Sequence, residues 1–128
     1  DTLRSRGLGD VYKRQPNLFI ITGPQSPSVL TNMLPSIEHH VDWIGDCVSY
    51  LEQKGHATIE ASLDAQTEWV EHVNEVGEAS VYPHCNSWYL GSNVPGKPRV
   101  FLPYLGFPPY AEKCTEVANR DYEGFALG

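Results

Sequence analysis

The sequence predicts an α/β protein with an incomplete sheet, and three observations support that fold class. Residues 18–22 form a short apolar, β-branched run, which is typical of a buried strand. A long amphipathic helix is expected to follow. Residues 82–98 then show no periodicity and predict a long irregular loop. Helices, a short strand and a long loop together favour a mixed fold.

The long helix is bounded by recognisable end signals. Thr31 and Asn32 can cap its N-terminus, and Pro35 is tolerated in a first turn, where amides have no intrahelical partner. Lys54 suits the last turn, and Gly55 is a natural residue just beyond it. Apolar residues at alternating steps of three and four predict a single core-facing stripe: Leu34, Ile37, Val41, Ile44, Val48 and Leu51.

Shorter elements are expected in the rest of the chain. Residues 57–60 can be extended, and Ser62 or Asp64 can cap a second helix with an apolar face of Trp69, Val73 and Val76. Residues 100–102 predict a strand. Two prolines at 108–109 introduce a third helix, expected at about residues 110–119.

Composition excludes several classes of function. The 128 residues allow one domain at most. A formal net charge of −7 argues against nucleic acid and against anionic membranes as partners, and no apolar run is long enough to span a bilayer. The three cysteines are widely spaced without a CxxC pair, which predicts free thiols in a cytoplasmic protein.

The first segment differs in kind from the remainder. Residues 1–15 hold four of the nine basic residues and show no amphipathic period. Residues 5–15, SRGLGDVYKRQ, resemble a translated sequencing adapter, so we interpret residues 1–15 as a non-native tail and residues 16–128 as one segment. A natural basic arm is the alternative.

Spacing alone indicates little chemistry. The five histidines form no HExxH motif and no zinc-finger spacing, so we expect no metal site and interpret them as solvated helix-face residues. Cys85 beside His84 weakly suggests an activated thiolate, with a plain buried or loop cysteine as the alternative. Ser26 and Ser28 do not form a nucleophile elbow, and the sequence contains no GxGxxG motif and no P-loop.

Four blocks resemble Baeyer–Villiger flavin monooxygenases in order and spacing. They are PNLFIITGPQSPSVLTNMLPSIEHHVDWIGDCV (16–48), EWVEHVNEV (68–76), SWYLGSNVPGKPRVF (87–101) and YEGFAL (122–127). One departure is the single Gly106, where family members usually have two glycines, and this puts the local turn geometry in doubt.

The resemblance implies the C-terminal part of a flavoprotein with two dinucleotide-binding domains. The implied cofactors are FAD and NADPH, and the implied reaction inserts one oxygen atom of O2 into a ketone to give an ester or lactone. An N- or S-oxygenating flavin monooxygenase is one alternative. A small acidic interaction module without enzymatic activity is another.

The resemblance also implies site residues. Asn32 and Met33, at a helix N-terminus that carries about half a positive charge, are expected to contact the flavin. Ser28, Val29 and Leu30 are expected to line the substrate pocket, with an ordinary surface loop as the alternative.

Two further residues are implied at the nicotinamide nucleotide. Trp88 matches the tryptophan of a mobile loop that contacts this cofactor, with a core anchor as the alternative. Lys97 is a candidate phosphate neighbour, although a solvated turn lysine is the more ordinary interpretation. Trp43 and Trp69 are assigned to packing.

The family's nucleotide loops and its catalytic arginine are expected upstream of this segment, so no catalytic residue is assigned. We therefore expect the chain alone to be inactive. The strand at residues 18–22 would lack its partners, and the apolar helix stripe would be only partly covered. A marginal or aggregating fold is the expected consequence.

Overall fold

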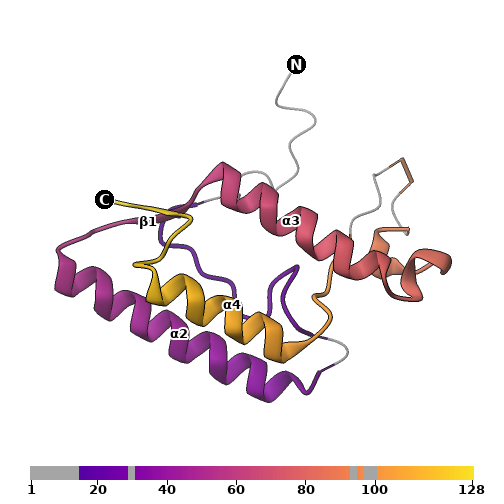
Figure 1. Ribbon diagram of the computed structural model, residues 1–128, viewed down its shortest axis with the longest axis horizontal. Coiled ribbons are helices and arrows are strands. Elements are labelled where there is room, and N and C mark those ends of the chain that lie inside the picture. The colour runs from indigo at the N-terminus through magenta and orange to yellow at the C-terminus, as the bar shows by residue number, and fades with distance from the viewer. Residues whose placement is uncertain (1–14, 29–30, 93–94, 97–100) are drawn as a thin grey trace.

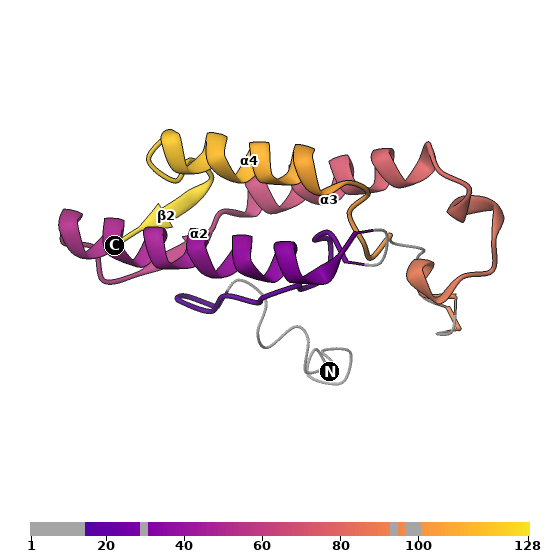
Figure 2. The same cartoon turned by 90° about the horizontal axis from the view of Figure 1, so that it is seen from below.

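The structure is a computed structural model that describes residues 15–28, 31–92, 95–96 and 101–128. Its regular elements are the helices α2 (Met33–Lys54), α3 (Leu63–Glu78) and α4 (Phe107–Asn119), the strands β1 (Ile59–Ala61) and β2 (Phe125–Leu127), and two short 3-10 turns. Helices α2 and α4 lie side by side and run in the same direction, while α3 runs the opposite way (Figures 1 and 2). The predicted α/β class is confirmed, with a small two-stranded sheet.

Helix α2 begins and ends where the sequence predicts. The Asn32 side chain accepts a hydrogen bond from the Leu34 amide, and Gly55 ends the helix in the left-handed conformation with φ 76°. That conformation costs glycine nothing, because glycine has no Cβ to clash with the backbone. Within the described part of the chain, no helix is both long and apolar enough to cross a membrane.

The buried face of α2 differs from the predicted one. The side chains that α2 buries are Ser36, His40, Cys47 and Leu51. Of the predicted apolar stripe, only Leu51 is buried, whereas Leu34, Val41 and Val48 are 67, 50 and 43% exposed. The stripe is thus only partly covered, as expected for this chain alone, and the face that α2 buries most completely is a different one. The neighbours that α2 has here, α4 and residues 15–28, lie against its more polar side.

Residues 18–22 do not form the predicted strand. Leu18, Ile20 and Ile21 are exposed, and the segment is held at its two ends. Asn17 donates its backbone amide to the Ile59 carbonyl at 3.0 Å and accepts the Ile59 amide on its side chain at 2.9 Å. In the described residues the sheet holds only β1 and β2, so the run lies near β1 without joining its ladder.

The first hydrophobic cluster lies where the small sheet meets α2. Strands β1 and β2 pair antiparallel, with Ile59 opposite Leu127. Ile59 packs in a cluster with Cys47, Leu51 and Tyr122, and Trp43 packs against the Tyr122 ring edge-on at 5.2 Å. The extended piece expected at residues 57–60 is thus β1, which begins two residues later and ends one residue later than expected.

The second cluster lies between α3 and the irregular segment. Ser62 caps α3 through its side chain, as one of the two expected caps. Val73 is fully buried in a cluster with Leu90, Phe101 and Tyr104, and Trp69 and Val76 pack against it, so the predicted apolar face of α3 is confirmed. The two 3-10 turns, η1 (Tyr82–His84) and η2 (Trp88–Leu90), interrupt the predicted irregular loop.

Two predictions about residues 100–119 need correction. Phe101 and Leu102 are not in a strand, and Val100 lies outside the described residues. Helix α4 begins at Phe107, three residues earlier than expected, because both prolines fit its first turn. Gly106 precedes it with φ 120° and ψ 118°, a conformation that a single glycine supplies without a second one.

Candidate functional site

The loop between residues 23 and 28 is held by its own hydrogen bonds. The Ser26 hydroxyl donates to the Gly23 carbonyl at 2.7 Å, and the Ser26 amide donates to the same carbonyl at 3.3 Å. Ser26 and Pro27 are both buried. The loop before α2 is therefore a compact turn whose interior is filled by Ser26 and Pro27.

Helix α2 fastens this loop from one side. The Ser36 hydroxyl, which is fully buried, donates to the Pro27 carbonyl at 3.1 Å. One turn further along, Nδ1 of His40 accepts the Thr22 amide at 3.1 Å. Thr22 has φ 52°, a left-handed conformation that costs a β-branched residue about 1–2 kcal/mol. The two bonds from α2 therefore hold the loop in place at both of its ends.

The segment at residues 101–104 fastens the loop from the other side. The Ser26 carbonyl accepts the Tyr104 amide at 3.1 Å, and the Gln25 amide donates to the Leu102 carbonyl. The Leu102 amide in turn donates to the Tyr89 carbonyl at 2.9 Å. One backbone segment thus bridges the loop before α2 and the η2 turn, which are far apart in sequence.

The Phe101 end of this bridge is also fixed by α3. Asn74 accepts the Phe101 amide on its side chain at 3.1 Å. Gly77 lets the Phe101 ring lie directly on the helix, since a Cβ there would come within 2.7 Å of that ring. The bridge is therefore held on a rigid element rather than on a loop alone.

The N-terminus of α2 carries the residues expected at the flavin. Asn32 uses its side-chain oxygen on the Leu34 amide at 3.1 Å, and Pro35 has no amide proton. Met33 is 41% exposed, and its amide, at the first helical position, has no acceptor within the helix. No carboxylate lies in the first turn. Asn32 therefore acts as a cap, and the Met33 amide is a donor that the helix itself leaves without a partner.

Trp88 lies on the η2 turn and is 59% exposed. Its ring lies against Tyr89 with centroids 4.0 Å apart, and the turn is capped by the Ser87 hydroxyl, which accepts the Tyr89 amide at 3.2 Å. The alternative of a core anchor does not describe such an exposed ring. The η2 turn that carries Trp88 is joined to the 101–104 bridge through the carbonyl of the neighbouring Tyr89.

Three of the expected site residues are outside the described part of the chain. These are Val29 and Leu30 of the expected substrate pocket and Lys97 of the expected phosphate contact. Ser28 is described and half-buried, immediately after the buried Pro27. The expected positions of these residues stay predictions.

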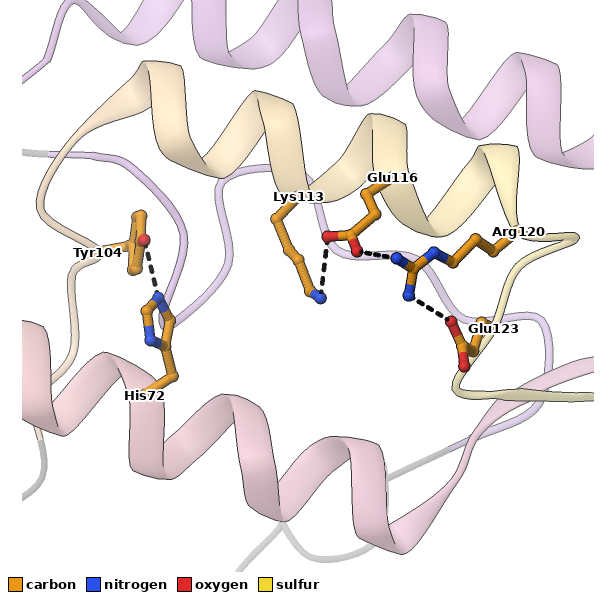
Figure 3. Close-up of polar contacts among 6 residues, drawn as sticks. All are labelled: His72, Tyr104, Lys113, Glu116, Arg120 and Glu123. Carbon is orange, nitrogen blue, oxygen red and sulfur yellow. Dashed lines mark hydrogen bonds and ion pairs between the residues drawn. The ribbon is translucent and has the colours of Figure 1, made fainter.

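The site contains shielded hydroxyl and thiol groups. Burial raises the pKa of Tyr104, whose hydroxyl lies 3.0 Å from Nε2 of His72, as the two labelled side chains in Figure 3 show. Burial also raises the pKa of Cys114, and more strongly that of Tyr110, which lies beside the Cys114 thiol. These groups stay protonated near neutral pH and can act as hydrogen-bond donors.

The charged groups that Figure 3 draws on α4 and on the turn that follows it are of another kind. Lys113, Glu116, Arg120 and Glu123 form ion pairs of 2.8–3.3 Å whose side chains are all more than 40% exposed. Exposed pairs of this type contribute little to stability, about 0–1 kcal/mol each. They form an ordinary solvated helix face.

The histidines need a correction. His40 is buried and His39 half-buried, because the face of α2 that carries them packs against α4. The interpretation as solvated helix-face residues therefore fails for these two, while His84 is exposed as expected. Over the described ranges, no group of three or more His, Cys, Asp or Glu could hold a metal ion. Cys85 is exposed, and its thiol lies 3.4 Å from the Val81 carbonyl.

Sequence reasoning missed Ser36 and His40. The signal that could have revealed them is their spacing of four, which places two polar residues on one face of a helix. Apolar periodicity does not indicate that this face is buried, because the predicted apolar stripe lies on another face of the helix. Trp43 and Trp69 are packed as predicted, Trp43 through Nε1 to the Cys114 carbonyl at 3.0 Å and Trp69 against Tyr104.

Comparisons with known proteins place this geometry in a family. No protein-family profile matches the chain. Among curated proteins, the chain is 34% identical over 121 residues to cyclohexanone 1,2-monooxygenase of Acinetobacter sp, covering 94% of this chain and 22% of the relative. It is 34% identical over 116 residues to a Baeyer–Villiger monooxygenase of Pseudooceanicola batsensis, covering 90% and 21%.

The chain belongs to the Baeyer–Villiger monooxygenase family. It spans about a fifth of the length of the curated relatives it matches. A phenazine N-monooxygenase of Lysobacter antibioticus is also similar, with 36% identity over 121 residues, 94% of this chain and 22% of the relative.

Solved structures agree with the sequence relatives. The fold matches an oxidized steroid monooxygenase bound to NADP with a TM-score of 0.79 and 49% identity, over 88% of this chain and 20% of that one. It also matches a complex of OTEMO with FAD and NADP, with a TM-score of 0.79 and 26% identity, over 91% and 21%. These solved monooxygenases thus share the backbone fold of this chain over most of its length.

Proposed function

We propose that this chain is part of an FAD- and NADPH-dependent monooxygenase that inserts one oxygen atom of O2 into a ketone. The observation that carries the proposal is the loop before α2, which is fastened between α2 and residues 101–104 and ends at a helix N-terminus. Relatives include proteins named for ketones, and solved relatives hold NADP or both FAD and NADP.

The residues at this N-terminus fit a flavin. Helix α2 has 22 residues and carries no carboxylate in its first turn, and the Met33 amide at its first position has no acceptor within the helix. A helix N-terminus carries about half a positive charge, which stabilises an electron-rich ring edge placed against it. When FAD is bound and has been reduced by NADPH, it supplies the electrons for activating O2.

The chain's own residues would bind and orient rather than react. Met33 would donate its amide to the flavin, while Asn32 would keep the helix end in shape by capping Leu34. Ser28, with Val29 and Leu30, would line the ketone pocket beside it. Trp88 would cover the nicotinamide nucleotide, since its ring is exposed and its indole N–H can donate to a ribose hydroxyl. Lys97 would lie near a phosphate.

A second candidate chemistry is N-oxygenation. The similarity to a phenazine N-monooxygenase is as high as the similarity to the cyclohexanone enzyme. The substrate assay should therefore contain a cyclic ketone and an aromatic N-heterocycle. The Cys47, Cys85 and Cys114 thiols are all free, which supports a cytoplasmic location.

The chain by itself is expected to be inactive, because it contains neither of the two GxGxxG nucleotide loops of the family. Purified 128-residue chain should bind no stoichiometric FAD and should not oxidise NADPH. Absorbance near the flavin band and the decay of NADPH fluorescence measure the two outcomes. A yellow preparation that consumes NADPH would contradict this expectation.

A chimera tests the proposed function directly. Residues 16–128 would replace the matching fifth of the steroid monooxygenase, whose sequence is 49% identical. The chimera should retain FAD and oxidise NADPH in a ketone-dependent manner, with an ester or lactone as product. A second chimera with Trp88→Ala should keep its FAD but raise the KM for NADPH, because only the nicotinamide contact is removed.

The outcomes separate the roles. A chimera that binds FAD but yields no oxygenated product from ketone or N-heterocycle would overturn the proposed function. An unchanged KM for NADPH in the Trp88→Ala chimera would overturn the role of Trp88 alone. His84→Gln serves as the matched control, since His84 is an exposed side chain on the neighbouring η1 turn.

A further inference from the structure

The strongest feature outside the proposed contacts is a part-buried series of hydrogen bonds that joins the loop to two helices through the buried His40. His40 on α2 accepts the Thr22 amide on Nδ1 at 3.1 Å. Its Nε2 lies 2.9 Å from the Tyr110 hydroxyl on α4. The Tyr110 hydroxyl lies beside the Cys114 thiol one turn further along α4. A loop, α2 and α4 are therefore joined through one imidazole.

The two bonds fix the protonation state of His40. A backbone amide can only donate, so Nδ1 must be the unprotonated acceptor. Nε2 then carries the ring proton and donates it to the Tyr110 oxygen. Tyr110 keeps its own proton, which remains available for Cys114. Each donor in this series of hydrogen bonds faces an acceptor only when the His40 imidazole is neutral and carries its proton on Nε2.

We propose that His40 is a positioning residue that holds the start of the flavin-side loop against α2 and α4, and that protonation of its imidazole releases the loop at Thr22. The assignment of the loop to the flavin side rests on the proposed function. Protonation would place a second N–H on Nδ1, opposite the Thr22 amide, so that two donors would face each other at 3.1 Å.

Thr22 is the point at which release has a structural consequence. It holds a left-handed backbone with φ 52°, directly before Gly23, which is the acceptor for both Ser26 bonds. Thr22 can return to an ordinary conformation once its amide is free. Such a change would move Gly23 and, with it, the turn in which the Ser26 hydroxyl and amide bond to the Gly23 carbonyl.

The groups around His40 favour the neutral form. On its own helix, the ring of His39 lies 6.1 Å away between centroids, and on α4 the ring of Tyr110 lies at 5.4 Å. Burial, and then the neighbouring His39, lower the pKa of His40. Cys114 interacts with Tyr110, and the described part of the loop bonds His40 through the Thr22 amide. No ion pair within the described ranges includes His40.

The test follows the loop and the imidazole in the 128-residue chain by NMR. Ring nitrogen shifts report the tautomer of His40, and amide hydrogen exchange reports the protection of Thr22 between about pH 5 and 8. We expect the Nε2–H tautomer at neutral pH and a loss of Thr22 protection of roughly tenfold as His40 gains a proton. The two titrations should share one midpoint.

Substitutions provide the matched comparison. His40→Asn places an amide oxygen near the position of Nδ1, so Thr22 should stay protected and lose its pH dependence. His40→Leu keeps the volume but not the acceptor, so Thr22 should be unprotected at every pH. His84→Gln, at an exposed histidine, should leave the wild-type titration unchanged.

Several results would overturn the proposal. An Nδ1–H tautomer of His40, a Thr22 amide that is unprotected at neutral pH, or protection that persists while His40 is protonated would each do so. The wild-type titration needs no variant, so it decides even when a substitution fails to fold. No flavin is present in this experiment. A negative NMR result for His40 and Thr22 would therefore not bear on the proposed function. An inactive chimera would likewise not bear on the role of His40.

Discussion

The two faces of α2 contrast in a way that reverses the usual rule. The face toward α4 and the loop buries Ser36, His40 and Cys47, and it is rich in hydrogen bonds. The face that carries Val41 and Val48 is apolar and half exposed. Burying a polar group costs little when it is hydrogen-bonded, and an apolar side chain stays exposed where no neighbouring element covers it. The contrast teaches that burial follows the neighbours present and not the apolar pattern alone.

The largest expected effect comes from the one stripe residue that is buried. Leu51→Ala should lower the free energy of unfolding by about 2–5 kcal/mol, because Leu51 packs in the cluster with Cys47, Ile59 and Tyr122. Urea unfolding followed by circular dichroism measures the change. The control is Val48→Ala on the exposed face, which should change it by less than about 0.5 kcal/mol. Equal losses for the two variants would break the contrast between the faces.

The buried polar face predicts the next effect. Ser36→Ala should cost about 1–3 kcal/mol, because it leaves the buried Pro27 carbonyl without a donor. Ser49→Ala is the matched control on the same helix, since the Ser49 hydroxyl is exposed and bonds only the Gly45 carbonyl at 2.9 Å. The same unfolding measurement applies. A neutral Ser36→Ala would show that the loop does not depend on α2.

Alkaline pH should weaken the first hydrophobic cluster, which contains Tyr122. Burial, followed by the nearby Cys47 and Asp46, raises the pKa of Tyr122 to about 12. An unfolded tyrosine loses its proton at about pH 10, so between pH 10 and 12 the unfolded state binds fewer protons than the folded state. Stability should therefore be complete below pH 10 and fall as pH rises through this window. Tyr122→Phe should flatten that part of the profile of unfolding free energy against pH.

The exposed apolar face predicts the smallest change in stability and a visible change in association. The double variant Val41→Ser with Val48→Ser should alter the free energy of unfolding by less than about 0.5 kcal/mol per site. It should also reduce self-association in sedimentation velocity, because exposed apolar patches promote contact between molecules. A large loss of stability would mean that this face is buried in solution.

The sequence determined the elements whose causes are local. The ends of α2 at Asn32 and Gly55 and the cap of α3 at Ser62 follow from side chains that lie next to the helix ends. The four family blocks are likewise contiguous stretches of sequence, so they can be recognised without the fold, and the relatives found are of the same family. The positions of Ser28, Met33 and Trp88 in a flavin site stay predictions, because they depend on groups that the described residues do not include.

Only the tertiary structure decided which face of α2 is buried and that residues 18–22 are not a strand. Both depend on partners distant in sequence: a strand needs a neighbouring edge, and a helix stripe needs a covering surface. The same holds for Thr22, His40 and Tyr110, whose hydrogen-bonded chain spans 88 positions of sequence between residues 22 and 110. Periodicity reports what a helix could bury, and the packing of α2, α4 and the loop decided what it does bury.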